Sequence, residues 1–238
     1  MVIELEECTS TNDYMREHLD ELSDGAVITA ELQTNGRGRR GHIWEADSGM
    51  LPISILMKNP IERDTITARV GLAVCYALEQ VTGLSEICIK WPNDIIVGDK
   101  KVCGILCECS FLGDCACVIC GIGVNVSQSE EFFKRRDLPN GASLLTLSGE
   151  IYERNTLIEA IAENVNRLAN MSFSQCIADF RSRVINLGRT IRLVEKNGCR
   201  TAKAVDIAPN GFLICEDKNG RFEVGSGEVS VRGENGYI

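Results

Sequence analysis

Hydrophobic residues recur with the period of a helix in four segments of the first 185 residues. From Ile66 to Val81, apolar residues return every three or four positions, which predicts an amphipathic helix over 65–81. The same spacing predicts helices over 11–19, 155–168 and 173–185. Short apolar runs between the helices predict strands over 26–31, 51–57, 86–90, 94–97, 102–110 and 116–125. Because strands joined by hairpins alternate with helices, we predict an α+β fold, with a mixed β-sheet and helices packed on one face.

After Gly188 the helical period disappears and the pattern becomes purely β. Short apolar runs predict strands over 190–194, 201–207, 212–215, 222–224 and 229–231. The turns between them carry Asn197-Gly198, Asn210-Gly211 and Asn219-Gly220, and Asn-Gly is a strong signal for a two-residue hairpin turn. We therefore predict two domains: a main domain over 1–186 and a small antiparallel β domain over 187–238 that packs on it.

Composition and charge narrow the class of protein. Hydrophobic residues make up 44% of the chain and charged residues 25%, ordinary values for a globular protein with a core. The net charge of −9 argues against nucleic acid as the main partner, because phosphate contacts supply most of that affinity. No apolar run reaches the roughly 18 residues that a membrane span needs, and the acidic start is unlike a targeting peptide. We expect a cytoplasmic protein with no membrane partner.

Twelve cysteines are many for 238 residues, and six of them fall between Cys103 and Cys120. Cys107 and Cys109 are two positions apart within an apolar run, a spacing that places both on one face of a strand. There cysteine behaves as a small hydrophobic residue, so we expect buried structural thiols. A metal site and redox chemistry remain as alternatives.

The segment from Gln33 to Trp44 is the first candidate for chemistry. Its three glycines let the backbone approach a ligand, and its three arginines, Arg37, Arg39 and Arg40, offer donors that suit phosphate or carboxylate. Trp44 could stack on a flat ring such as adenine. A solvated basic turn and a nucleic-acid-binding arm are the alternative interpretations.

Two further segments carry polar groups at the ends of strands. Pro92 stiffens the chain just before Asn93 and Asp94, whose oxygens are of the kind that Mg²⁺ prefers when it also binds phosphates. Lys101, near Gly104, could point into a pocket as a phosphate-binding charge. The alternative for both segments is an ordinary turn between strands with surface side chains.

Five motifs, taken in order, closely resemble the biotin protein ligase family. They are Ser10-Thr11-Asn12, Gly36-Arg37-Gly38-Arg39-Arg40-Gly41 with Trp44, Lys90-Trp91-Pro92-Asn93-Asp94, Lys101 with Gly104-Ile105-Leu106 and Glu108, and Gly121 with Gly123 and Asn125. The match spans about residues 9–126, and the β tail looks like the C-terminal domain of that family. The resemblance implies a biotin/lipoate ligase-like catalytic domain followed by a small SH3-like antiparallel β-barrel. It is closest to the short form, without an N-terminal DNA-binding domain, so we expect no repressor activity.

The resemblance also implies roles for single residues. Biotin would be bound by Ser10, Thr11, Asn12, Gln33, Gly36, Arg37, Lys101 and Gly104. ATP would be bound by Arg37, Arg39, Arg40, Trp44, Asn93, Lys101 and Asn125. The catalytic residues would be Lys101, Arg39 and Arg37; Asn93 and Asp94 would bind Mg²⁺, and Lys90 would lie on the acceptor side.

The activity implied by the resemblance is that of a biotin–[acetyl-CoA-carboxylase] ligase. Such an enzyme uses ATP to form biotinyl-5'-AMP and transfers biotin to a lysine of a biotin carboxyl carrier protein or domain. Members of the family often form homodimers. Two departures concern the pocket: His42 stands where the family usually has a basic residue, and Met50-Leu51-Pro52 replaces the usual strand entry. A lipoate or octanoate ligase on the same fold and a non-catalytic biotin sensor are the alternatives.

Overall fold

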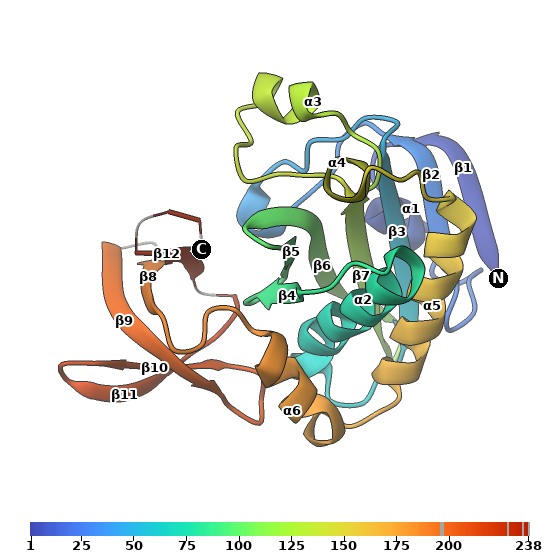
Figure 1. Ribbon diagram of the computed structural model, residues 1–238. Helices are drawn as coiled ribbons and strands as arrows, with labels where there is room; N and C mark the ends of the chain where they lie inside the picture. Colours follow the sequence, from blue (N-terminus) through green and yellow to red (C-terminus); the bar gives the residue numbers. More distant parts are fainter. Residues whose placement is uncertain (196–197, 228, 235, 238) are drawn as a thin grey trace.

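The computed structural model describes residues 1–195, 198–227, 229–234 and 236–237, which form a large seven-stranded sheet with helices and a smaller five-stranded sheet (Figure 1). The large sheet has the strand order β1-β2-β3-β7-β6-β5-β4. Its strands are β1 (Val2–Cys8), β2 (Val27–Gln33), β3 (Met50–Lys58), β4 (Ile87–Lys90), β5 (Asp94–Val97), β6 (Lys100–Leu112) and β7 (Cys115–Asn125). Strands β1 and β2 are parallel, whereas the other neighbours are antiparallel. The predicted mixed sheet is confirmed.

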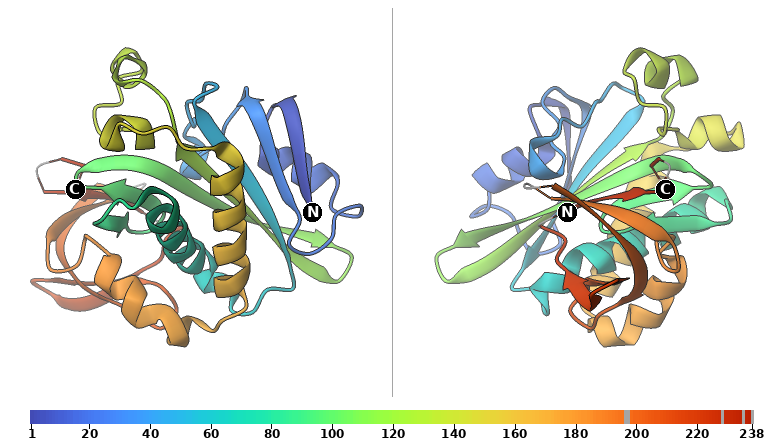
Figure 2. Two further views of the ribbon diagram at one scale, coloured as in Figure 1. Left: turned by 45° about the vertical axis from the view of Figure 1, so that its right-hand side comes forward. Right: turned by 90° about the vertical axis from the view of Figure 1, so that its left-hand side faces the viewer.

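Alternate residues along the strands face two separate hydrophobic layers. The helices are α1 (Thr11–Glu17), α2 (Ile66–Thr82), α3 (Glu130–Arg135), α4 (Leu144–Ser148), α5 (Arg154–Ala169) and α6 (Phe173–Arg183), with short 3-10 turns over 39–41 and 63–65. Val27 and Ile55 belong to the layer of α2 and α5, whereas Ile28 and Leu56 pack with Met15 of α1. The long helices therefore cover one face, as predicted, and α1 lies on the opposite face (Figure 2). Since β1 and β2 are parallel neighbours, the chain must cross over between them, and α1 is part of that crossover.

The first strand, β1, was not among the predicted strands. It lies at the edge of the sheet, with Glu4 and Glu6 exposed and Ile3 and Leu5 half-buried. The alternation of these four residues is the signal of a half-buried strand. An acidic edge of this kind also discourages pairing with a second sheet.

The smaller sheet contains the C-terminal strands in the antiparallel order β11-β10-β9-β8-β12. They are β8 (Thr190–Glu195), β9 (Gly198–Ile207), β10 (Leu213–Asp217), β11 (Gly220–Val224) and β12 (Ser230–Gly233). Gly211 and Gly220 of two predicted Asn-Gly turns have φ values of 81° and 112°, which favour glycine. Asn197 of the remaining predicted turn lies outside the described residues. The predicted small antiparallel β unit is confirmed.

The C-terminal sheet meets the large domain near the turn between β4 and β5. Trp91, fully buried, donates through Nε1 to the carbonyl of Gly211 at 3.1 Å, and its backbone N–H donates to Asn186 Oδ1 at 2.7 Å. Lys90 Nζ donates to the carbonyl of Val231 at 3.0 Å. The Lys-Trp-Pro-Asn-Asp motif thus begins with residues that join the two sheets.

Arg69, in α2, is fully buried in the core. Its NH1 donates to the carbonyls of Ala169 at 2.7 Å and Met171 at 2.8 Å, and its NH2 donates to those of Ile61 and Glu62. Ala169 ends α5, where helix carbonyls lack partners within the helix. Arg69 therefore caps α5 and ties it to the turn before α2.

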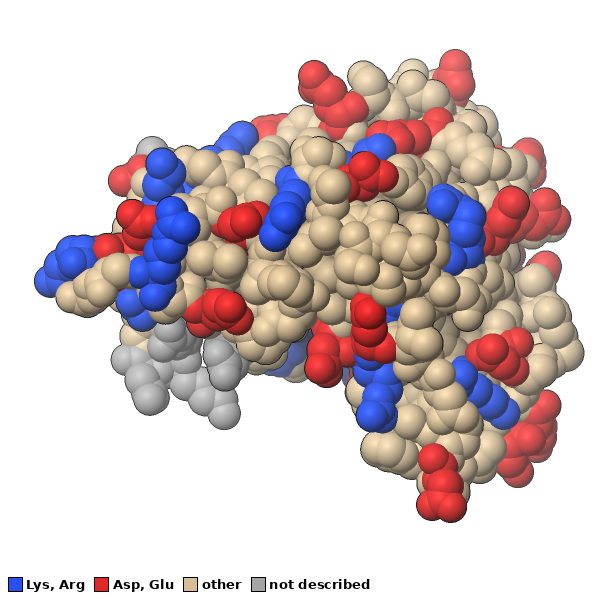
Figure 3. All heavy atoms as spheres, turned by 90° about the horizontal axis from the view of Figure 1, so that it is seen from below, with Lys and Arg blue, Asp and Glu red and all other residues tan. Residues whose placement is uncertain are grey.

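Charges of both signs are interspersed on the surface that Figure 3 shows. Lysine and arginine side chains gather toward its left side, and acidic side chains prevail at its right edge. Among the described residues, no helix combines the length and the apolar character that crossing a membrane requires.

Candidate functional site

A cavity of about 670 Å³ opens between the two sheets and collects almost every predicted site residue. This volume is within the range of sites for small molecules and cofactors. Its lining includes Ser10, Thr11, Asn12, Gln33, Arg37, Arg39, Arg40, Trp44, Lys90, Asn93, Asp94, Lys101, Gly104 and Asn125. Gly36 lines a smaller adjoining pocket. Motifs that are far apart in the sequence therefore face one space.

One end of the cavity is a polar recess formed by Ser10, Thr11 and Gln33, all buried. Thr11 donates to Gln33 Oε1 twice, from its backbone N–H at 3.0 Å and from its hydroxyl at 3.3 Å. These bonds fix the orientation of the Gln33 carboxamide. Ser10 stands at the N-cap of α1, but its side chain makes no capping hydrogen bond. Its hydroxyl is therefore not used by the helix, and the recess offers fixed donors and acceptors to a compact polar group.

Ser54 of β3 supports the recess from behind and was not identified from the sequence. Its side chain is fully buried, and its Oγ lies 2.8 Å from Thr11 Oγ1 and 2.6 Å from Asn12 Oδ1. Asn12 in turn donates to Glu108 Oε2 at 2.8 Å. Gly121 leaves room for Asn12, because a β-carbon there would lie 2.5 Å from Asn12 Oδ1. A serine inside an otherwise apolar strand was the available signal.

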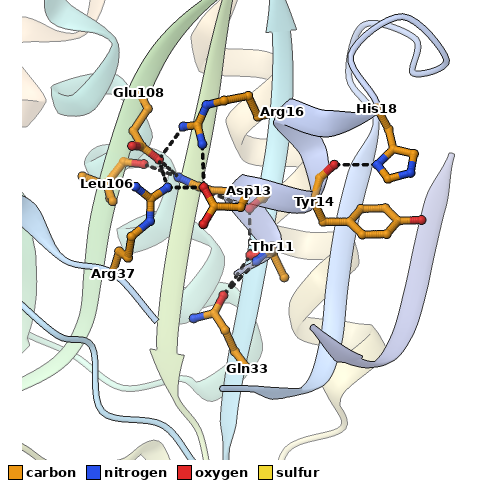
Figure 4. A network of polar contacts seen from close by, with 11 residues as sticks. Thr11, Asp13, Tyr14, Arg16, His18, Gln33, Arg37, Leu106 and Glu108 are labelled. Carbon is orange, nitrogen blue, oxygen red and sulfur yellow. Dashed lines mark hydrogen bonds and ion pairs between the residues drawn. The ribbon is translucent and has the colours of Figure 1, made fainter. Parts of the chain in front are cut away.

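Residues 36–44, which we call the arginine loop, fold back on themselves beside the recess. The backbone N–H of Gly38 donates to the His42 carbonyl at 2.7 Å, and that of Trp44 donates to the Gly36 carbonyl at 2.9 Å. Arg37 points toward α1 and β6, where it pairs with Asp13 and Glu108 (Figure 4). The loop is thus a folded hairpin with its own hydrogen bonds.

Arg39 and Arg40 turn the other way, toward the C-terminal sheet. Arg39 donates to Asn93 Oδ1 at 3.0 Å and also to the carbonyls of Ser226 and Val229. Arg40 donates to the Val194 carbonyl at 3.1 Å and to Ser230 Oγ at 3.0 Å. Burial lowers the pKa of the Arg39 guanidinium from its ordinary value. The two arginines therefore lie at the junction of the domains, with their charge next to the cavity.

The cationic wall of the cavity is built around Asp94. Its carboxylate lies 2.5 Å from Lys101 Nζ, accepts a hydrogen bond from the Tyr237 hydroxyl at 2.7 Å, and lies 3.9 Å from Lys90 Nζ. Burial opposes ionisation of Asp94, but Lys101 and Lys90 hold the pKa of its carboxyl below the usual value. Burial lowers the pKa of Lys90 to about 8. Lys90 lies beneath β12 rather than on an open surface.

Asn93 and Asp94 do not fit a directly bound magnesium ion as they are arranged. Both carboxylate oxygens of Asp94 are taken by Lys101 and Tyr237, and Asn93 Oδ1 accepts from Arg39. A divalent cation there would also face several positive side chains at short range, and like charges repel strongly in a buried site.

Trp44 lies on a floor made by two glycines. A β-carbon at Gly104 would lie 2.6 Å from Trp44 Cζ3, and one at Gly123 would lie 2.7 Å from Trp44 Nε1. Lys101 Nζ stands 4.9 Å from the centre of the ring, and the buried Nε1 has no hydrogen-bond partner among the described residues. The glycines of β6 and β7 thus admit an indole, and the predicted adenine contact of Trp44 stays a prediction.

Asn125 holds a segment that the sequence analysis did not identify as part of the site. Its Nδ2 donates to the carbonyls of Ala142 at 3.0 Å and Lys101 at 3.3 Å. Residues 132–133 and 137–141 line the cavity, and Phe132 and Phe133 pack edge to face with 5.3 Å between ring centres. The Phe-Phe pair was the available signal. The predicted nucleotide contact of Asn125 stays a prediction.

All twelve cysteines are free thiols, and half of them are buried. Burial raises the pKa of Cys75 and Cys103 well above its ordinary value. Cys109 and Cys199 are exposed. Within the described ranges, no group of three or more His, Cys, Asp or Glu side chains is placed to share a metal ion. The six buried thiols agree with the predicted structural role. For Cys109 the prediction is wrong, and Cys107 is only half-buried, because no residue of β6 after Ile105 is fully buried.

The chain matches two family models and many known proteins. Residues 3–125 match the biotin/lipoate A/B protein ligase family, and residues 187–232 match the biotin protein ligase C-terminal domain. A biotin--[acetyl-CoA-carboxylase] ligase of Mycobacterium tuberculosis is 31% identical over 87% of this chain and 79% of its own length. The bifunctional ligase/repressor BirA of Bacillus spizizenii is 29% identical over 87% of this chain, which spans 66% of that relative. The solved structure of the biotin protein ligase from Aquifex aeolicus in complex with biotin and ATP has a TM-score of 0.81 and 32% identity, covering 98% of this chain and 99% of that one.

Proposed function

Because the chain belongs to the biotin/lipoate A/B protein ligase family, we propose that it is an ATP-dependent ligase that activates biotin and attaches it to a lysine of an acceptor protein. The observation that carries this proposal is the cavity with two unlike ends. The recess of Ser10, Thr11 and Gln33 is neutral and polar, whereas Arg39 and Lys101 line a cationic side. A ligand with a polar ring at one end and a carboxylate next to a phosphate at the other would match the neutral recess and the cationic side of the cavity.

In the first half-reaction, the carboxylate of biotin attacks the α-phosphorus of ATP, pyrophosphate leaves, and biotinyl-5'-AMP remains. Two anions must meet, so the protein has to supply positive charge where negative charge develops. Lys101 lines the cavity, with its ammonium over the ring of Trp44 and beside Asp94, and it is our candidate for supplying that charge. Magnesium enters this proposal as part of the MgATP substrate.

In the second half-reaction, the amine of the acceptor lysine attacks the mixed anhydride and expels AMP. We place the acceptor among carboxylase carrier proteins or domains, a step that rests on the relatives whose names include acetyl-CoA carboxylase. The net charge of −9 supports a protein rather than a nucleic acid as partner. A homodimer and a cytoplasmic location rest on the family resemblance, and light scattering of the purified protein tests the former.

The decisive experiment offers MgATP with biotin, lipoate or octanoate in separate reactions, and follows pyrophosphate release and acyl-adenylate formation by mass spectrometry. We expect the adenylate with biotin. Addition of a carrier domain should then shift the mass of its lysine by one biotinyl group. Lys101→Gln should abolish adenylate formation, and the neighbouring Lys100→Gln is the matched control, since Lys100 donates to the Pro139 carbonyl outside the cationic cluster.

Three other outcomes would contradict the proposal in different ways. Adenylate formation with lipoate or octanoate instead of biotin would keep the chemistry and overturn the substrate. Binding of biotin without pyrophosphate release would favour a non-catalytic sensor. Equal rates of adenylate formation by the Lys101→Gln and Lys100→Gln proteins would show that Lys101 has no role in the reaction.

A further inference from the structure

Two lysines on the cationic wall of the cavity have one carboxylate between them. Asp94 Oδ1 lies 2.5 Å from Lys101 Nζ, and Asp94 Oδ2 lies 3.9 Å from Lys90 Nζ. Asp94 and Lys90 are buried, and all three residues line the cavity. Opposite charges attract strongly in such a site, so both ammonium groups draw on the same carboxylate. A further contact is needed to decide which lysine keeps it.

Tyr237 supplies that contact, because it touches both Asp94 and Lys90. Its hydroxyl donates at 2.7 Å to Asp94 Oδ2, which is the oxygen on the side of Lys90. The centre of its ring lies 4.2 Å from Lys90 Nζ, close enough for a cation–π interaction. The same ammonium donates to the Val231 carbonyl at 3.0 Å. Tyr237 thus occupies Oδ2 and gives Lys90 another partner, which leaves Oδ1 to Lys101.

The C-terminal sheet brings Tyr237 to this place. Gly236 forms an isolated antiparallel bridge with Gly233, the last residue of β12. Gly236 and Tyr237 both line the cavity, and Tyr237 is half-buried. The sequence analysis did not identify Tyr237, because it lies more than a hundred positions after Asp94 and belongs to none of the five motifs.

We propose that Tyr237 is a positioning residue that reserves the carboxylate of Asp94 for Lys101. This proposal rests on the proposed function for the reaction that Lys101 serves. Tyr237 acts through Asp94, which keeps the Lys101 ammonium 4.9 Å from the centre of the Trp44 ring. Without the hydroxyl, Lys90 draws the carboxylate toward itself and the ammonium of Lys101 loses its fixed position. A misplaced charge slows the reaction even when the substrates still bind.

The first test is the rate of adenylate formation in the Tyr237→Phe protein, which keeps the ring over Lys90 and removes only the hydroxyl. The rate of biotinyl-AMP formation is measured in a single turnover with saturating biotin and MgATP, and the Kd for biotin is measured separately. We expect the rate to fall about tenfold, the effect of one hydrogen bond to a charged group, with Kd within about twofold. Tyr237→Leu also removes the ring and should be slower still.

The second test is tryptophan emission without substrates, which does not depend on activity. Moving the Lys101 ammonium changes the electric field at the indole of Trp44, so the emission maximum should shift in Tyr237→Phe. The chain has two tryptophans. The shift should therefore disappear when Tyr237→Phe is combined with Trp44→Phe, which leaves the emission of Trp91 alone.

Tyr76→Phe is the matched control. The Tyr76 hydroxyl donates to Asp179 Oδ2 at 2.7 Å, the same kind of bond at the same length, and joins α2 to α6. This variant loses a tyrosine–aspartate hydrogen bond without touching the cationic wall. It should form biotinyl-AMP at the wild-type rate and keep the wild-type emission.

A wild-type rate or wild-type emission in Tyr237→Phe would overturn the proposal. A raised Kd for biotin at an unchanged rate would also overturn it, since the hydroxyl would then act on binding. An equal loss of rate in Tyr76→Phe would mean that the effect is one of general structure. If the wild-type protein forms no biotinyl-AMP, the proposed function fails, and the emission measurement still decides whether Tyr237 positions Lys101.

Discussion

Replacing Ser54 with alanine should destabilise the protein out of proportion to the single oxygen that is removed. Ser54 Oγ has no exposure to solvent and contacts Thr11 Oγ1 and Asn12 Oδ1 at 2.8 and 2.6 Å. The lost hydrogen bond contributes about 1 kcal/mol, and a buried acceptor left without a donor costs about 1–3 kcal/mol. Asn12 is 4% exposed, so water does not readily replace the serine. We expect a loss of about 2–3 kcal/mol in the free energy of unfolding.

Equilibrium urea unfolding of Ser54→Ala and wild-type protein measures this loss directly. Ser182→Ala is the matched control, because the exposed Ser182 hydroxyl donates to the Asp179 carbonyl in the same chemical way. Its free energy of unfolding should change by less than about 0.5 kcal/mol, as is usual at surface positions. If the two substitutions changed the free energy of unfolding equally, the buried contacts of Ser54 with Thr11 and Asn12 would not be what stabilises the recess. KM for biotin should also rise in Ser54→Ala, since Thr11 loses its support.

Three further predictions follow from other parts of the structure. Gly104→Ala would place a β-carbon 2.6 Å from Trp44 Cζ3. We therefore expect the free energy of unfolding, measured by thermal denaturation, to fall by about 1–3 kcal/mol and the tryptophan emission to change. Unchanged emission would contradict this packing. Burial lowers the pKa of Lys90 from its ordinary 10.5 to about 8, so the unfolded chain binds more protons than the native one between these values and stability rises with pH there. In the wild-type protein the free energy of unfolding, measured with urea, should rise by up to about 1.4 kcal/mol per pH unit in this range, and Lys90→Met should lack that rise. Parallel pH profiles of the two proteins would contradict the prediction. A thiol reagent should label Cys109 and Cys199 first in the native protein; uniform labelling of all twelve cysteines would contradict the observed burial.

The long elements of the fold could be predicted because their burial is periodic in the sequence. Helix α2 repeats apolar residues along one stripe and was expected within one residue of its observed ends. Strand β1 was not predicted, since it is an edge strand whose Ile3 and Leu5 are only half-buried. The position of α1 on the opposite face of the sheet follows from the parallel pairing of β1 and β2. No local sequence pattern encodes that pairing.

The candidate site could be predicted from motifs as a set of residues but not as a set of contacts. The sequence indicated Arg37, Arg39 and Arg40 as hydrogen-bond donors to anions. In the structure Arg37 faces Asp13, whereas Arg39 and Arg40 face Asn93 and the C-terminal sheet. Which arginine meets Asp13 and which meets the C-terminal sheet depends on the fold of the loop. Ser54 stands out in the sequence only as a lone hydroxyl in an apolar strand, and that signal does not tell which residues it contacts.

The burial of Arg69 has a consequence for the order in which the chain can fold. A guanidinium gives up its hydration only when other acceptors replace the water, and the acceptors here lie at 61–62 and at 169 and 171. An intermediate in which α2 had docked without the end of α5 would leave NH1 of Arg69 without its two acceptors. Burying such a donor is costly, so we expect these segments, about a hundred positions apart, to become ordered together.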